Sequence, residues 1–183
     1  MNLYNRSLII GKGKGISNFL SRELKIDSYP SKVLKDLNLT DYDNIIYTST
    51  DPSHNISFGT IPLYLEKNIR SIYHILESNF RGKLTYLSSI DSGPYNVFKE
   101  NQKNQIEDMY TSYSFCKLMA ESLLASHSLF EKCTILRLGL LWPTTGNSNF
   151  FNAVESDPQN INLNLNSSYY LTPYSLVLKY LIN

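Results

Sequence analysis

A group of three glycines that directly follows the first apolar run constrains the fold of this chain more than any other feature. Leu8-Ile9-Ile10 is followed at once by Gly11-Lys12-Gly13-Lys14-Gly15. The next segment, Ile16–Leu24, has apolar residues at helical spacing. A strand, a glycine turn and a helix in this order predict a site where backbone N–H groups at a helix start receive a pyrophosphate. A flexible turn is the alternative, because neither common glycine spacing of dinucleotide sites is matched fully.

Predicted strands and helices alternate along the rest of the chain. Further strands are expected at Lys25–Tyr29, Asp43–Thr48, Lys83–Leu87, Thr134–Leu141 and Ile161–Leu165, and further helices at Leu63–Ser78, Tyr110–Ser126 and Pro173–Ile182. Strands separated by helices predict an α/β fold with a Rossmann-like, doubly wound parallel sheet. We expect residues 1–143 to form this dinucleotide-binding domain. Residues 144–183 are expected to form a small C-terminal lobe at the carboxyl edge of the sheet, not an independent domain.

Composition excludes several classes of protein. The 183 residues fit one domain, 42% of them are apolar, and the net charge is +1 without a cluster of basic residues, so we expect no nucleic-acid partner. No apolar run approaches the roughly 20 residues that span a bilayer, which predicts a cytoplasmic protein without a membrane partner. Cys116 and Cys133 are expected to be reduced structural residues, and no metal-ligand spacing is present.

A tyrosine and a lysine stand four residues apart in the segment Tyr113-Ser114-Phe115-Cys116-Lys117. This spacing places both on one face of a helix. A fixed cation about 4 Å from the phenol is worth ~4 kcal/mol at an effective dielectric near 20, so it lowers the phenol pKa towards a useful range. A solvated surface pair is the alternative for these two residues when they are taken alone.

A predicted strand ends in hydroxyls at Leu84-Thr85-Tyr86-Leu87-Ser88-Ser89. Together with the glycine turn and the Tyr113/Lys117 pair, it makes the chain resemble the extended short-chain dehydrogenase/reductase family of sugar-nucleotide epimerases, dehydratases and reductases. Further similar segments are the helix that contains Asn68, the strand Ile135-Leu136-Arg137-Leu138-Gly139, and Tyr169-Tyr170-Leu171-Thr172-Pro173-Tyr174-Ser175-Leu176.

The resemblance implies a role for each matching residue. Tyr113 would be the acid/base, Lys117 would lower its pKa and hold the nicotinamide ribose, and Ser89 would hydrogen-bond the substrate oxygen. The cofactor would be NAD or NADP. It would be bound by Gly11, Gly13, Gly15, Ile16, Asp27, Asn68 and Lys117.

The sequence leaves two alternatives for the cofactor and two for the activity. Asp27 favours NAD, because a carboxylate at the end of the second strand accepts hydrogen bonds from a ribose, whereas Lys12 and Lys14 favour the extra phosphate of NADP. Leu140 replaces an Asn of the family pattern, and the chain ends before the family's substrate lobe is complete. We therefore expect an enzyme acting on a nucleotide sugar or a similar carbonyl or alcohol, with a catalytically silent dinucleotide-binding module as the alternative.

The helix Tyr110–Ser126 carries a second apolar stripe, formed by Phe115, Leu118, Met119 and Ser122, opposite the face of Tyr113. An exposed stripe of this kind is unusual on a monomer, so we expect either the short C-terminal tail or another subunit to cover it. Related enzymes pair through this helix, so the resemblance implies a homodimer in which the stripe meets its own copy.

Overall fold

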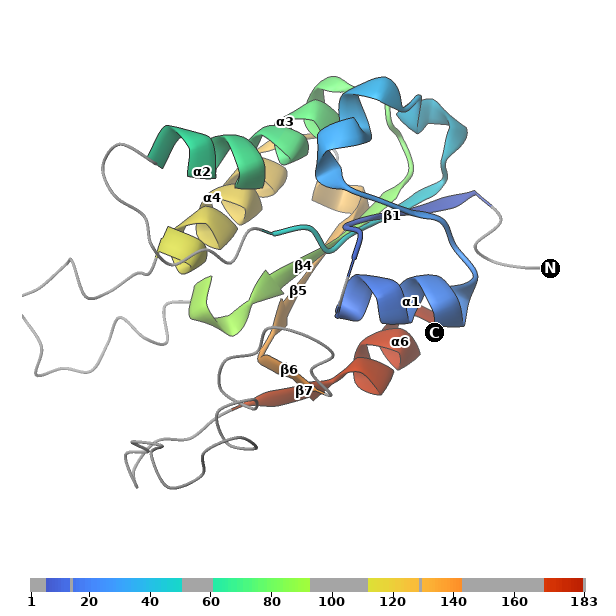
Figure 1. Ribbon diagram of the computed structural model, residues 1–183. Coiled ribbons are helices and arrows are strands. Elements are labelled where there is room, and N and C mark those ends of the chain that lie inside the picture. Colours follow the sequence, from blue (N-terminus) through green and yellow to red (C-terminus); the bar gives the residue numbers. More distant parts are fainter. Residues whose placement is uncertain are drawn as a thin grey trace, which may run out of the picture.

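The molecule is built on a five-stranded parallel sheet with the order β2-β1-β3-β4-β5 (Figure 1). The computed structural model describes residues 6–13, 15–50, 61–92, 112–128, 130–142 and 170–182. The strands are β1 (Ser7–Ile10), β2 (Ser28–Tyr29), β3 (Asn44–Tyr47), β4 (Lys83–Ser89) and β5 (Cys133–Leu138). Every neighbouring pair runs parallel, so all five carboxyl ends lie at one edge. The predicted Rossmann-like class is confirmed.

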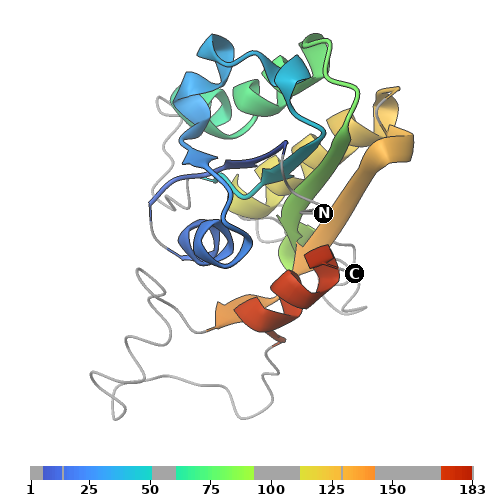
Figure 2. The same ribbon diagram turned by 90° about the vertical axis from the view of Figure 1, so that its right-hand side faces the viewer.

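Helices cover both faces of the sheet, as the alternation of strands and helices predicts. One face carries α2 (Ile61–Asn68), α3 (Arg70–Glu77) and α4 (Ser112–Ser126), and the other carries α1 (Ile16–Leu24) and α6 (Tyr174–Ile182) (Figures 1 and 2). Short 3-10 turns lie between them, at η1 (Ser31–Asp36), η2 (Leu39–Asp41), η4 (Ile90–Ser92) and η7 (Phe130–Lys132).

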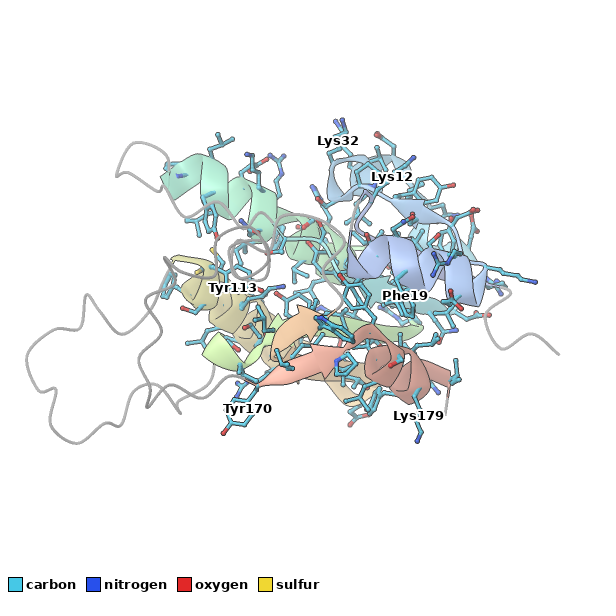
Figure 3. The ribbon with its side chains drawn as sticks, turned by 60° about the horizontal axis from the view of Figure 1, so that its bottom comes forward. Lys12, Phe19, Lys32, Tyr113, Tyr170 and Lys179 are labelled. Carbon is cyan, nitrogen blue, oxygen red and sulfur yellow. The ribbon has the colours of Figure 1, made fainter. Side chains whose placement is uncertain are left out.

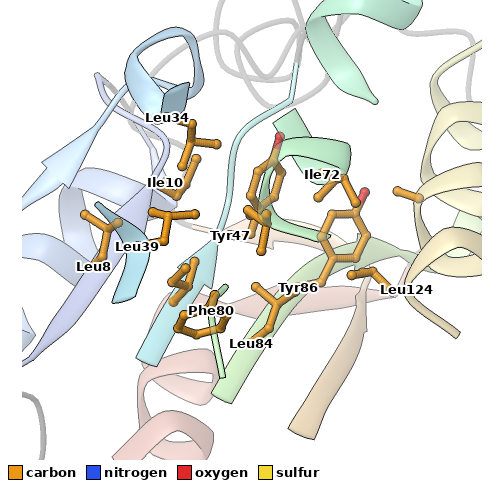
Figure 4. Close-up of a cluster of buried hydrophobic side chains, with 13 residues drawn as sticks. Leu8, Ile10, Leu34, Leu39, Tyr47, Ile72, Phe80, Leu84, Tyr86 and Leu124 are labelled. Carbon is orange, nitrogen blue, oxygen red and sulfur yellow. The ribbon is translucent and has the colours of Figure 1, made fainter. Parts of the chain in front are cut away.

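Two apolar cores lie on the two faces, because successive strand residues point to opposite sides. Ile10 packs with Ile72 of α3 and Leu124 of α4 in the first core, which Figure 4 shows. Ile9 packs with Leu20 of α1 and Val177 of α6 in the second core. Leu8, Ile9 and Ile10 of β1 are completely buried, as expected for a central strand covered by helices on both faces.

The predicted helix Leu63–Ser78 is divided into α2 and α3 at Ile69. Asn68 is the last residue of α2 before the break, and its side-chain amide donates to the Tyr64 carbonyl over 3.0 Å. The backbone bonds from Ile69 N–H to the Leu65 carbonyl and from Tyr73 N–H to the Ile69 carbonyl still cross the junction. The interruption is therefore slight.

The predicted strand Thr134–Leu141 is also divided, into β5 and β6 (Leu140–Trp142). β6 pairs with β7 (Leu171–Pro173) in a separate two-stranded sheet. The break falls at Gly139, where a Cβ atom would lie 2.1 Å from the Tyr170 carbonyl oxygen, so only glycine admits β7 this closely.

The C-terminal helix begins one residue later than predicted, at Tyr174. Tyr174 and Val177 belong to the same core as Ile9, and α6 packs beside α1. The predicted strand Ile161–Leu165 lies outside the described residues, and the predicted division at residue 143 stays a prediction. None of the helices in the described ranges is both long enough and apolar enough to cross a membrane.

Candidate functional site at the carboxyl edge of the sheet

The glycine turn connects β1 to α1 with a backbone that only glycine adopts readily. Gly11, Gly13 and Gly15 have φ angles of 135°, 132° and 77°. A Cβ atom at Gly11 would lie 2.1 Å from Thr48 Oγ1, just beyond β3, whereas one at Gly13 would meet no described atom within 4 Å. The turn is thus packed against β3 at its start and open above its centre.

Helix α1 starts at Ile16 with Gly15 as its N-cap, which offers no side-chain cap for the first N–H groups. A helix start of this kind attracts an anion through the direction of its N–H groups and its dipole. Lys14, one of the two predicted phosphate-binding lysines, lies outside the described residues. Tyr174 of α6 also reaches this turn, because a Cβ atom at Gly15 would lie 3.3 Å from its hydroxyl oxygen.

Asn68 lies at the same edge of the sheet, beyond the end of β3. Its side chain is buried, with 6% exposed, and its Oδ1 accepts a hydrogen bond from Thr50 Oγ1 over 3.2 Å. Thr50 follows β3 by three residues, so the bond ties α2 to the loop that leaves this strand. The structure brings Asn68 to the edge that the glycine turn occupies.

Asp27 lies before β2, not at its carboxyl end: the predicted start of this strand at Lys25 is wrong, whereas its predicted end at Tyr29 is confirmed. Lys25 adopts the left-handed conformation (φ 56°) that ends α1, and the strand contains only Ser28 and Tyr29. The end of β2 leads instead through Pro30 to Ser31 at the start of η1. Asp27 is therefore displaced from the position where a ribose would lie beside this strand.

Lys12 and Lys32, both labelled in Figure 3, follow the carboxyl ends of the neighbouring strands β1 and β2. Ile10 and Tyr29 are register partners, and each lysine follows the end of one of these paired strands within three residues. Both side chains are exposed. Lys12 was considered from the sequence but Lys32 was not, although the second strand was correctly predicted to end at Tyr29.

Lys117 is the buried cation of the site, with only 4% of the residue exposed. Its Nζ donates to the Leu87 carbonyl in β4 over 2.8 Å and lies 4.9 Å from the centre of the Tyr86 ring and 5.7 Å from that of Tyr113. Burial lowers the pKa of Lys117 to about 8, against opposing effects of Glu121 and Cys116. The ammonium is thus held between β4 and the tyrosine one helical turn away.

Ser89 is the last residue of β4 and is buried, with 7% exposed. Helix α4 packs on β4 and on η4, which continues from Ser89. The structure therefore brings the strand end that carries Ser89 and the helix that carries Tyr113 and Lys117 together at the carboxyl edge. What each of the three does chemically stays a prediction.

Glu121, which sequence analysis missed, lies one turn beyond Lys117 on α4. It is buried, with 6% exposed, and accepts hydrogen bonds from Ser88 Oγ over 2.5 Å and Ser92 Oγ over 2.8 Å. Arg137 of β5 forms an ion pair with it, at 2.6 Å between Nη2 and Oε2. Its position four residues after Lys117, on the same face of the helix, could have identified Glu121 from the sequence.

Comparison with solved structures places this geometry in a known fold. The chain is similar to RMD from Pseudomonas aeruginosa complexed with NADPH, with a TM-score of 0.64, 17% identity, and coverage of 97% of this chain and 73% of that one. It is also similar to MoeE5 in complex with UDP-glucuronic acid and NAD, with a TM-score of 0.68, 18% identity, and coverage of 97% of this chain and 71% of that one. A third similar structure is UDP-N-acetylglucosamine 4-epimerase from Methanobrevibacter ruminantium M1 in complex with UDP-N-acetylmuramic acid. Its TM-score is 0.65 at 15% identity, with coverage of 95% of this chain and 70% of that one.

The chain has the fold of these three proteins. At such low identity the likeness shows the fold alone. No family model matches the sequence, and no curated protein sequence matches it. The chain spans about seven-tenths of the length of each of these three structures.

Proposed function

We propose that the chain is an NAD(P)-dependent oxidoreductase of the epimerase/dehydratase type that acts on a nucleotide sugar or a similar carbonyl or alcohol. The observation that carries this proposal is the buried Lys117 ammonium, 5.7 Å from the Tyr113 ring at the carboxyl edge of a parallel sheet. Doubly wound folds bind their ligands at this edge. The bound NADPH, NAD and UDP-sugar of the similar structures support the same class of ligand.

The residues present fit a dinucleotide. No described atom lies close above Gly13, α1 begins without a side-chain cap, and Lys117 supplies a buried donor two strands away. In this proposal the pyrophosphate lies over Gly11–Gly15 and the N–H groups from Ile16 onward. Lys117 holds the nicotinamide ribose, and Asn68 borders the site.

Each residue of the reaction centre then has one task. The bound nicotinamide supplies the hydride chemistry. Tyr113 accepts or donates a proton at its phenolic oxygen, and the positive charge of Lys117 stabilises its anionic form. Ser89 donates a hydrogen bond to the substrate oxygen and so fixes the reacting carbon next to Tyr113.

The test is a pair of measurements on the same preparation. Calorimetric titration with NADH and NADPH measures cofactor binding, and absorbance of reduced nicotinamide over a panel of nucleotide sugars measures turnover. We expect micromolar binding together with turnover of at least one sugar. Binding without turnover would favour the silent module, for which Leu140 in β6 is the main sequence argument, and absence of binding would reject both functions.

We also propose a homodimer through α4. The exposed side of this helix carries a hollow of about 420 Å³ lined by Phe115, Leu118, Met119, Ser122, Leu123 and Ser126. Phe115 is 49% exposed, although it is a large apolar residue. A second copy of the same helix would cover this face.

A further inference from the structure

Four polar side chains from four elements meet in one cluster beneath the reaction centre, and three of them are buried. We call it the Glu121 cluster; it comprises Ser88 of β4, Ser92 of η4, Arg137 of β5 and Glu121 itself. Ser88, Ser92 and Glu121 are 5%, 1% and 6% exposed. Burying a carboxylate here has a cost that only its partners offset.

The carboxylate has partners at both oxygens. Oε1 accepts from the Ser88 and Ser92 hydroxyls, and Arg137 Nε lies 3.1 Å from each oxygen while Nη2 donates to Oε2 over 2.6 Å. Burial opposes ionisation of Glu121, but the hydrogen bonds from Arg137, Ser88 and Ser92 together hold its pKa below the ordinary value. Glu121 is therefore a carboxylate at neutral pH.

The cluster fixes the strand end that carries Ser89. Ser88 precedes Ser89 directly, and Ser92 Oγ also lies 2.6 Å from the Ser89 carbonyl oxygen. Each hydroxyl has a single proton, so Ser92 donates either to that carbonyl or to Glu121 at one time. On the other side of Ser88, Lys117 Nζ donates to the Leu87 carbonyl. Consecutive residues of β4 are thus held by two side chains of one helix.

The same helix carries the proposed acid/base. Tyr113, Lys117 and Glu121 are spaced by four residues and lie on one face of α4. Any shift of α4 along β4 would change the distance from Tyr113 to Ser89, and the Glu121 cluster resists such a shift. The charge of Glu121 also favours the protonated form of Lys117. The other groups that face Lys117 are Tyr86 of β4 and Tyr113 and Cys116 of α4. Arg137 of β5 is bound to Glu121.

We propose that Glu121 is a positioning residue for the reaction centre, because it locks helix α4 to the Ser88–Ser92 segment through Ser88, Ser92 and Arg137. The proposal rests on the proposed function for its effect on turnover. Its geometric part does not depend on that function. Glu121 touches neither substrate nor cofactor in this role.

The first test uses Glu121→Gln, which keeps the shape and removes the charge, with Glu66→Gln as the matched control. Glu66 forms an exposed ion pair with Arg70 on the other helices of the same face. We expect Glu121→Gln to lower kcat ~100-fold, as a displacement near 1 Å does, while cofactor affinity at pH 7 changes less. The control should leave kcat unchanged. Equal kcat for Glu121→Gln and wild type would overturn the proposal.

A second variant separates positioning from a merely structural ion pair. The double change Glu121→Leu/Arg137→Met replaces the pair by apolar side chains, which is often neutral for stability. We expect the double variant to fold, with turnover still depressed. Full turnover in this folded variant would show that the pair only fills space.

Two readouts on the cofactor-free protein decide the proposal even if no turnover is found in wild type. Carbon-13 NMR of Lys117, assigned by its loss in Lys117→Met, should show its titration midpoint of about 8 moving to lower pH in Glu121→Gln. Amide hydrogen exchange should become at least about tenfold faster at residues 89–92. An unchanged midpoint together with unchanged exchange would reject the positioning role, whereas absent cofactor binding in wild type would reject only the proposed function.

Discussion

Burial of Lys117 links the stability of the molecule to pH at the scale of a single side chain. Its pKa falls from 10.5 to about 8 on folding. Below pH 8 the lysine is protonated in both the folded and the unfolded state, so burial of the charge lowers the free energy of unfolding in full. As pH rises from 8 to 10.5, the folded state loses the proton first, and this destabilisation disappears. Wild type should therefore gain about 2 kcal/mol in free energy of unfolding, relative to Lys117→Met, between pH 7 and about pH 9.5.

Urea unfolding of both proteins across this range measures the difference directly. Burial raises the pKa of the Cys116 and Cys133 thiols to about 11, which lowers stability above pH 9 in both proteins. Taking the difference between wild type and variant removes most of that effect. A difference independent of pH would mean that Lys117 is not a buried, protonated lysine.

Tyr113 offers the sharpest single-atom test of the proposed reaction. Tyr113→Phe removes one hydroxyl from a half-buried ring, so the fold and cofactor affinity should be retained. Turnover should fall by ~10²-fold or more, as expected for a missing acid/base. Tyr73→Phe is the matched control, because Tyr73 is 51% exposed on α3. A Tyr113→Phe protein with more than about a tenth of wild-type activity would remove Tyr113 from the mechanism.

Helices and strands with a pattern inside one short segment could be predicted from the sequence. Boundaries set by contacts with distant segments could not. The apolar run of β1, the helical spacing of α1 and the four-residue interval from Tyr113 to Lys117 are each visible in one short segment. The predicted second strand started too early, because Lys25 takes a left-handed conformation that ends α1, and β5 was drawn too long because Gly139 meets Tyr170. Both depend on chain segments that only the fold brings together.

The β1–α1 turn should be intolerant of a side chain at its first glycine. Gly11→Ala combines a φ of 135° with a Cβ 2.1 Å from Thr48 Oγ1, so we expect a loss of roughly 3 kcal/mol in unfolding free energy and weaker cofactor binding. Thr48→Ala removes the clashing atom and should recover part of this loss in the double variant. Losses that simply add would show that the two residues are not in contact.

The paired ends of β1 and β2 should decide between the two cofactors. Lys12 and Lys32 place two exposed charges there, while Asp27 is displaced from the strand end. We expect Lys12→Glu/Lys32→Glu to weaken NADPH binding at least about tenfold and to leave NADH binding nearly unchanged, since only NADPH carries the extra phosphate. Lys179→Glu, at an exposed position of α6, measures the effect of one charge reversal away from this edge in the same calorimetric titration. Equal effects on both cofactors would contradict this assignment.

At the scale of the whole molecule, the packing of α4 on the sheet leaves the outer face of this helix without a partner among the described residues. α4 buries Ala120 and Leu124 against the sheet and turns Phe115 and Ser122 outwards. A soluble α/β domain covers the inner side of such a helix with its own sheet. Only another molecule, or a chain segment outside the described ranges, can cover the outer side.

A second copy is the occupant that we predict, because a stripe on one helix can meet itself across a two-fold axis and form a closed, isologous interface. Light scattering at micromolar concentration should give about twice the 21.0 kDa of one chain. Leu118→Glu/Met119→Lys places charges in the middle of the stripe and should yield folded monomers. Leu176→Glu/Tyr180→Lys makes an equal change on the exposed face of α6, where the two residues are 56% and 55% exposed, and should leave the dimer intact. A wild-type mass near that of one chain would refute the dimer, and a dimer that survives the α4 change but not the α6 change would move the interface to α6.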